Sequence, residues 1–158
     1  MAKRYVHEAE SDVVRRLLAE STPATSRLSE VEVASALVRR CCEGAFSVGE
    51  RDRALVALCT DFVSLYVIEL LPEISAATVE LLVRYRLRAG DAIQLASCLY
   101  LQQRSGLSID FVAYDTRLTE AARQAGLMLV SWLAISLKRL AEESSSGFPQ
   151  ARYEMQDH

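Results

Sequence analysis

The sequence lacks any long apolar run and any glycine-rich loop. Its most apolar stretch, residues 63–71, is interrupted by Ser64 and Glu69, whereas a membrane-spanning helix needs about 20 apolar residues. The six glycines are scattered singly, which excludes the phosphate-binding loops of the P-loop and Rossmann types. We therefore expect no contact with a membrane and no nucleotide-binding fold of these two kinds.

The cysteines also lack the spacing of a metal or redox motif. None of the four belongs to a Cys-x-x-Cys motif, and the sequence contains no Gly-x-Ser-x-Gly motif. These absences argue against a zinc site, a disulfide framework and a serine nucleophile. A secretory signal is missing too, because Lys3 and Arg4 precede a polar, acidic stretch. We expect small, mostly buried thiols in a protein of the reducing cytoplasm.

Positive charge is not abundant either. The chain has 18 Lys and Arg against 21 Asp and Glu, a net charge of −3, so any RNA contact must be confined to a local basic patch. Arg84, Arg86 and Arg88 form one such cluster just before Asp91. One interpretation is that these arginines hold an RNA backbone. An equally good one is that they form a solvated helix end that interacts favourably with the helix dipole.

The order of the apolar patterns predicts an α/β fold. Short segments rich in β-branched or aromatic residues alternate with segments of helical periodicity. This alternation is typical of a parallel sheet flanked by helices. We expect one domain over residues 1–141 and a polar, mobile tail over residues 142–158. The expected strands are residues 24–28, 65–70, 109–114 and 127–130, and the expected helices are residues 5–18, 29–42, 50–62, 75–85, 91–104 and 116–125.

Three acidic residues stand at the starts of predicted helices. Glu32, Asp91 and Asp115 each follow a strand or turn signal, and helices that leave one edge of a parallel sheet bring their starts together. Clustered carboxylates repel one another unless a cation lies among them. Mg²⁺ suits such a site because it takes oxygen ligands and keeps waters that can attack a phosphodiester.

Each acid also has a purely structural interpretation. Ser29 and Glu32 have the spacing of a capping box, which satisfies free amides at a helix start. Asp91 and Asp115 are suitable N-cap residues for the helices that follow them. Taken singly, none of the three requires a catalytic role.

Two segments together resemble a known family. The stretch L-R-A-G-D-A-I-Q-L-A over residues 87–96 and the later F-V-A-Y-D-T-R-L over residues 111–118 are similar to the PIN domain, and within it to the VapC-type toxins of bacterial toxin and antitoxin pairs. The resemblance implies a three-layer fold and an Mg²⁺- or Mn²⁺-dependent endoribonuclease that uses a metal-activated water. It makes Glu32, Asp91 and Asp115 the catalytic metal ligands, with Thr116 a nearby polar contributor. It also implies a homodimer and a cognate antitoxin.

The sequence departs from the family pattern at its N-terminus. Family members begin with a central strand that ends in D-[TS]-S-A-L and supplies the first metal-binding aspartate, whereas this sequence opens at the helix that follows it. We therefore expect a domain without that strand, through a start placed too far downstream, a truncated chain or natural degeneration. The alternative function is a catalytically inactive PIN-like protein that acts through antitoxin binding, self-association or RNA binding.

Overall fold

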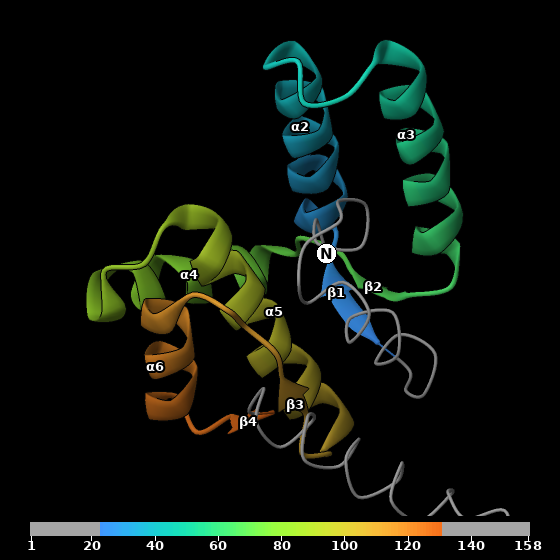
Figure 1. Cartoon of the computed structure of the whole chain (residues 1–158). Coiled ribbons are helices and arrows are strands. Elements are labelled where there is room, and N and C mark those ends of the chain that lie inside the picture. The colour runs from blue at the N-terminus through green and yellow to red at the C-terminus, as the bar shows by residue number, and fades with distance from the viewer. Residues whose placement is uncertain (1–22, 131–158) are drawn as a thin grey trace, which may run out of the picture.

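The computed structural model describes residues 23–130, which contain four short strands and five helices (Figure 1). None of the helices within this range is long and apolar enough to cross a membrane. The helix expected over residues 5–18 and the tail over 142–158 lie outside the described residues. The elements are β1 (Ala24–Ser26), α2 (Leu28–Cys42), α3 (Val48–Val63), β2 (Tyr66–Ile68), α4 (Pro72–Tyr85), α5 (Ala89–Ser105), β3 (Asp110–Phe111), α6 (Thr116–Gln124) and β4 (Met128–Leu129).

The strands pair in parallel, and this confirms the α/β class. β1 pairs with β2 in the register Thr25 to Val67, and β3 pairs with β4 in the register Phe111 to Leu129. Helices connect the strands of each pair, as parallel pairing requires. Within the part of the chain that the structure describes, the strands form two separate pairs and not one continuous sheet.

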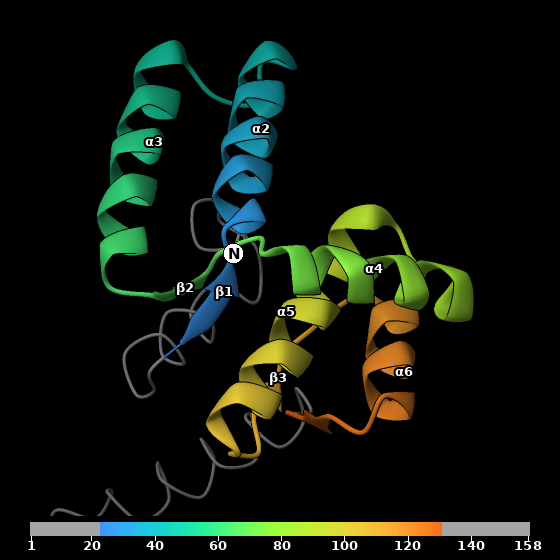
Figure 2. The ribbon, with the colours of Figure 1, turned by 180° about the vertical axis from the view of Figure 1, so that it is seen from behind.

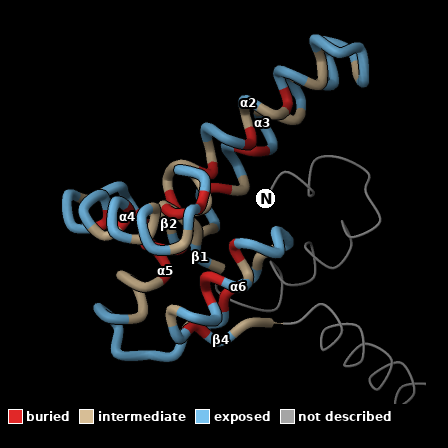
Figure 3. The backbone as a smooth tube through the Cα atoms, turned by 90° about the vertical axis from the view of Figure 1, so that its left-hand side faces the viewer, coloured by how far each residue is buried: buried red, intermediate tan, exposed pale blue. Residues whose placement is uncertain are grey.

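Helices α2 and α3 form a hairpin that projects from the rest of the molecule (Figure 2). Val33 and Leu37 of α2 are buried against Leu58 and Phe62 of α3. Leu58 and Phe62 belong to the apolar face that the 3.6-residue period predicts for the helix over residues 50–62. The far end of the hairpin, around residues 42–50, is mostly exposed (Figure 3).

Helix α5 is the centre of the body of the molecule. Ala92 and Leu95 are fully buried against α4, α6 and β3. Helix α4 begins at Pro72, three residues before the predicted start, because the fixed φ of proline suits the first turn of a helix. Helix α6 ends before Gly126, whose φ of +86° favours glycine.

Two predictions from the sequence are wrong. The strand expected over residues 109–114 shrinks to Asp110–Phe111, and the following Val112 is 43% exposed, so apolar character there does not reflect burial on both faces. The thiols are not mostly buried. Cys98 is buried, and its surroundings raise the pKa of the thiol to about 11, but Cys42 and Cys59 are exposed.

Candidate active site

The starts of α2 and α5 are joined by a partly buried hydrogen-bond network. Ser29 Oγ is paired with Thr25 Oγ1 at 2.7 Å and accepts a hydrogen bond from Gln94 Nε2 at 2.6 Å. Ser29 is 4% exposed, so water does not compete strongly for these groups. Glu32 lies one turn after Ser29 in α2, and Asp91 lies one turn before Gln94 in α5. The network therefore fixes the two helix starts that carry these acids.

Glu32 lies against the first turn of α5. A Cβ atom built at Gly90 would overlap Glu32 Oε1 and would lie 3.3 Å from its Cδ. Gly90 does not have the positive φ found at three other glycines of the described chain, so its role here is close approach and not backbone conformation. The absence of a side chain at Gly90 leaves the space that the Glu32 carboxylate occupies, beside Asp91.

Asp91 and Asp115 lie close enough to influence each other. Partial burial raises the pKa of the Asp91 carboxyl, and the negative charge of Asp115 raises that pKa further. The positive charges of Arg88 and Arg117 act in the opposite direction. An opposed pair of carboxylates of this kind is a favourable place for a cation, because a cation relieves the repulsion that the acids impose on each other.

Asp115 is the N-cap of α6, as its structural interpretation predicted. Its Oδ1 accepts a hydrogen bond from the Leu118 backbone N–H at 2.9 Å, and its backbone oxygen accepts one from Thr119 Oγ1 at 2.8 Å. Capping occupies only one lone-pair direction of an exposed carboxylate that has four. The side chain can therefore cap the helix and still act as a ligand. Thr116, the predicted polar contributor, is the exposed first residue of the helix.

The capping roles considered for the other two acids are wrong. Arg27 occupies the N-cap of α2, and no side chain caps that helix, because Ser29 is already inside the helix and bonded elsewhere. Arg88 is the N-cap of α5, so Asp91 lies within the first turn. The true capping box joins Ser47 and Glu50 at the start of α3. Neither Glu32 nor Asp91 therefore has the capping role that offered a structural explanation for it.

A surface ion network braces the start of α2 against the end of β2. Arg27 donates to Glu69 at 2.6 Å and to Glu30 at 2.9 Å, and these bonds raise the pKa of the Arg27 guanidinium. The partners are largely exposed, so each pair contributes little to stability. The network instead orients the start of α2 relative to the end of β2. No local sequence pattern predicts it, because Arg27 and Glu69 are distant in the chain.

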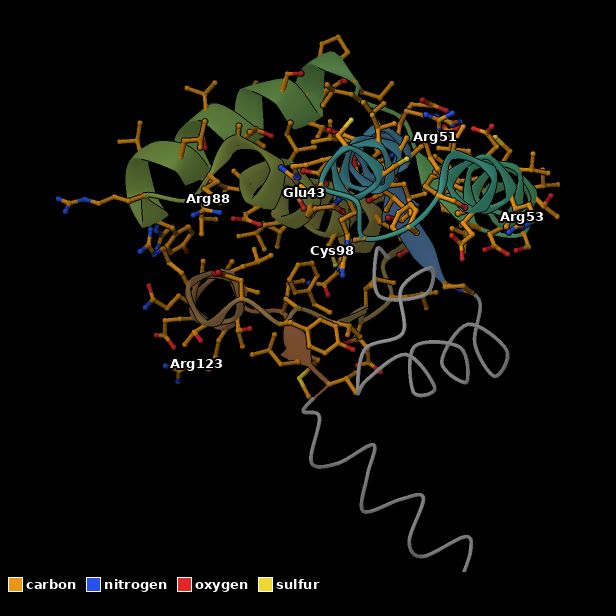
Figure 4. All side chains as sticks on the ribbon, turned by 45° about the horizontal axis from the view of Figure 1, so that its top comes forward. Glu43, Arg51, Arg53, Arg88, Cys98 and Arg123 are labelled. Atoms are coloured by element: carbon orange, nitrogen blue, oxygen red, sulfur yellow. The ribbon has the colours of Figure 1, made fainter. Side chains whose placement is uncertain are left out.

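The three predicted phosphate-binding arginines have different surroundings. Arg88 lies near enough to Asp91 to lower its pKa, and its side chain projects from the α4–α5 corner on the side of α6 (Figure 4). Arg84 lies over the ring of Tyr85, 5.2 Å from its centroid. Arg86 ends α4 in a left-handed conformation with φ +52° and is exposed. The structure thus brings Arg88 to the acids.

Arg117 is the residue near the acids that sequence reasoning missed. Its charge, like that of Arg88, acts on Asp91, although it belongs to α6 and not to the arginine-rich turn. The signal was present in the sequence, since Arg117 stands two residues after Asp115 in the D-T-R-L segment. Gln94 was missed for a different reason, because a polar residue inside a helical segment does not reveal its long-range partner.

The acids do not form a closed metal cage. Within residues 23–130, no group of three or more His, Cys, Asp or Glu side chains is gathered closely enough to hold a metal ion. The relations are instead pairwise: Glu32 packs against Gly90, and the charge of Asp115 acts on Asp91. The donor set consists of carboxylates, whose chemistry suits hard cations such as Mg²⁺ and Mn²⁺.

The sequence pattern of the PIN domain family matches residues 5–124. The chain belongs to the PIN domain family. The match covers 120 of its 158 residues and includes all three acids and the arginines beside them. PIN domains are generally metal-dependent nucleases that use divalent ions such as Mg²⁺, so this PIN domain belongs to a family of hydrolases that act on nucleic acid. A search of curated proteins found no match.

Proposed function

We propose that this PIN domain is an endoribonuclease of the VapC toxin type that depends on Mg²⁺ or Mn²⁺. Glu32, Asp91 and Asp115 would hold the ion. When bound, the ion supplies Lewis-acid activation of water and neutralises charge at the scissile phosphate. We expect this hydrolysis to leave a 5′-phosphate on one RNA fragment and a 3′-hydroxyl on the other.

One observation carries the proposal. Asp91 is half-buried, its pKa is raised by burial and by Asp115, and the Glu32 carboxylate packs against the glycine beside it. Two acids that destabilise each other in a folded protein incur an electrostatic penalty, and such penalties are concentrated at functional sites. A divalent cation removes this penalty and accounts for the arrangement.

The chain's own residues would perform the remaining work. Arg88 and Arg117 place two positive charges beside Asp91, where they would hold a phosphodiester and keep it from being repelled by the acids. The hydrogen bond from Gln94 to Ser29 would keep Glu32 and Asp91 in a fixed relation while the substrate binds. Thr116 would offer a hydroxyl at the edge of the site.

The partners expected from toxin biology form part of the proposal. A VapC-type protein acts in the cytoplasm as a homodimer, is restrained by a cognate antitoxin and cleaves RNA. The exposed valines on the α2–α3 hairpin, such as Val38 and Val56, are compatible with protein contacts of this kind.

A second candidate is a noncatalytic PIN-like protein that binds RNA, an antitoxin or another copy of itself. The observation that favours it is the absence, within residues 23–130, of a preformed group of three metal-binding side chains. The two candidates differ in one outcome, metal-dependent cleavage.

The test is cleavage of labelled single-stranded RNA with Mn²⁺, Mg²⁺ or EDTA. We expect cleavage with either ion, none in EDTA, and at least about a hundredfold loss of rate in Asp91→Asn, which keeps the size of the side chain but removes its charge. Running the variant beside the wild type excludes contaminating nucleases. If the folded wild type does not cleave RNA with either ion, the enzyme proposal is wrong and the binding protein is favoured.

A further inference from the structure

A groove next to the acids has not been assigned a role. It lies between the end of α4 and the outer turns of α6, has a volume of about 490 Å³ and is lined by residues that include Arg84, Tyr85, Thr116 and Arg117. This volume is in the range of ordinary ligand sites. Two of the lining residues are arginines, so the groove is suited to an anion.

The positive charges of this groove are available. Neither Arg84 nor Arg117 forms an ion pair with an acid of residues 23–130. The one acid in the lining, Glu120, is already paired with Arg123 at 2.7 Å and accepts a hydrogen bond from Gln124 at 2.7 Å. Its negative charge is therefore balanced locally, and the two arginines give the groove a net positive charge.

Tyr85 orders one of these charges. The Arg84 guanidinium lies 5.2 Å from the centroid of the Tyr85 ring, within the range of a cation–π interaction. The Tyr85 hydroxyl is buried and has no hydrogen-bond partner within the described residues, so the ring is held by packing and not by a polar anchor. A stacked guanidinium keeps its N–H donors free at its edge for a phosphate oxygen.

Arg117 connects the groove to the acids. It lines the groove, and its charge also acts on Asp91, so one side chain borders both places. A chain of phosphates bound along the groove would therefore meet Arg84 and Arg117, and the charge of Arg117 also acts on Asp91. Successive phosphates of a single strand present negative charge in the same linear order.

We propose that this groove binds the phosphate backbone of a single-stranded RNA next to the phosphate that is cleaved, with Arg84 and Arg117 each contacting one phosphate. This inference rests on the proposed function, because it treats the neighbouring acids as the place of cleavage. It adds a substrate-binding subsite formed by α4 and α6. Arg117 is the residue on the side of the acids, and Arg84, supported by the Tyr85 ring, is the other phosphate-binding residue.

The test is binding of a fluorescein-labelled oligouridylate in EDTA, measured by fluorescence anisotropy over a range of salt concentrations. The proteins are the wild type, Arg84→Ala, Arg117→Ala and the matched control Arg53→Ala, an exposed arginine on α3, far from Arg88 and α6 (Figure 4). We expect each groove variant to weaken binding by about tenfold and to reduce the slope of log K against log[salt] by about 0.7, while Arg53→Ala binds as the wild type does. Thermal unfolding of each variant checks that the fold is intact.

The outcomes separate this inference from the proposed function. Equal binding by Arg84→Ala, Arg117→Ala and the wild type overturns the groove, even if the protein cleaves RNA. Binding that depends on both arginines supports the groove even if no cleavage is seen with Mn²⁺, because no metal is needed in this assay. If inorganic phosphate at low concentration displaces the oligouridylate completely, the groove is a site for a free anion, and the proposed RNA subsite is wrong.

Discussion

At the scale of single residues, the most informative position is a glycine. Gly90 lies inside the first turn of α5, where glycine is less favourable than alanine by about 1 kcal/mol. No positive φ requires it. The space beside it is filled by the carboxylate of Glu32. The close approach of Glu32, and not the backbone conformation, therefore accounts for a glycine at this position.

Replacing this glycine should separate stability from activity. Gly90→Ala improves helix propensity. The new methyl group meets Glu32 Oε1, the far end of a flexible side chain. We therefore expect unchanged thermal stability or a gain of up to about 1 kcal/mol. The same methyl group displaces the Glu32 carboxylate, so we expect RNA cleavage with Mn²⁺ to fall by about tenfold to a hundredfold. Both quantities are measured on the same preparation, by thermal unfolding and by initial rates.

The chain offers a matched control for this substitution. Gly49 occupies the corresponding second position of α3, and a Cβ there would meet only Arg53 at an ordinary 3.6 Å. Gly49→Ala should stabilise the protein and leave cleavage unchanged. Similar rates for Gly90→Ala and Gly49→Ala would show that the position of the Glu32 carboxylate does not matter for activity.

At the scale of elements, the site depends on how α2 is attached to α5. A side-chain hydrogen bond from Gln94 to Ser29 joins these two helices, and Ser29 also pairs with Thr25 of β1. Three elements thus meet at one buried hydroxyl. Glu32 lies one turn from Ser29, and Asp91 lies one turn from Gln94.

Removing the joint should affect activity more than its cost in stability suggests. Gln94→Ala deletes one hydrogen bond, so we expect a loss of about 1 kcal/mol in the free energy of unfolding. Because the starts of α2 and α5 are then free to shift, we also expect a clear drop in metal-dependent cleavage, measured as kcat at saturating RNA. In a double-mutant cycle, Ser29→Ala and Gln94→Ala should be non-additive.

Gln102 supplies the comparison. It lies near the other end of α5, where its Oε1 accepts a hydrogen bond from the Ile109 backbone at 3.2 Å. Gln102→Ala should cost a similar amount of stability but should leave kcat unchanged. If the two glutamine variants lose the same fraction of activity, the bond between Ser29 and Gln94 has only a structural role.

The elements also show what sequence patterns can and cannot predict. Periodicity located α2, α3 and α5 to within three residues, because each buries one apolar face. It overestimated the strand at residues 109–114, since an apolar segment can lie in an exposed loop such as that of Val112. The spacing Ser-x-x-Glu predicts a capping box at Ser29, but the box forms at Ser47. The same spacing occurs at both serines, and only the tertiary contacts of Ser29 distinguish them.

At the scale of the whole molecule, a net negative chain carries a local positive region. The net charge is −3, yet Arg88 and Arg117 lie beside Asp91, and Arg84 extends this region along the groove with α6. The sequence predicted the acids and the need for a local basic patch. It did not predict the contribution of Arg117, because that depends on how α6 packs against the α4–α5 corner.

The central claim is that Glu32, Asp91 and Asp115 together bind one divalent ion, and Mn²⁺ titration by calorimetry tests it most directly. We expect the wild type to bind Mn²⁺ and both Asp91→Asn and Asp115→Asn to bind it about tenfold more weakly or worse. Asp52→Asn, at an exposed aspartate on α3, should bind as the wild type does. Undiminished Mn²⁺ binding by Asp91→Asn and Asp115→Asn would contradict the account.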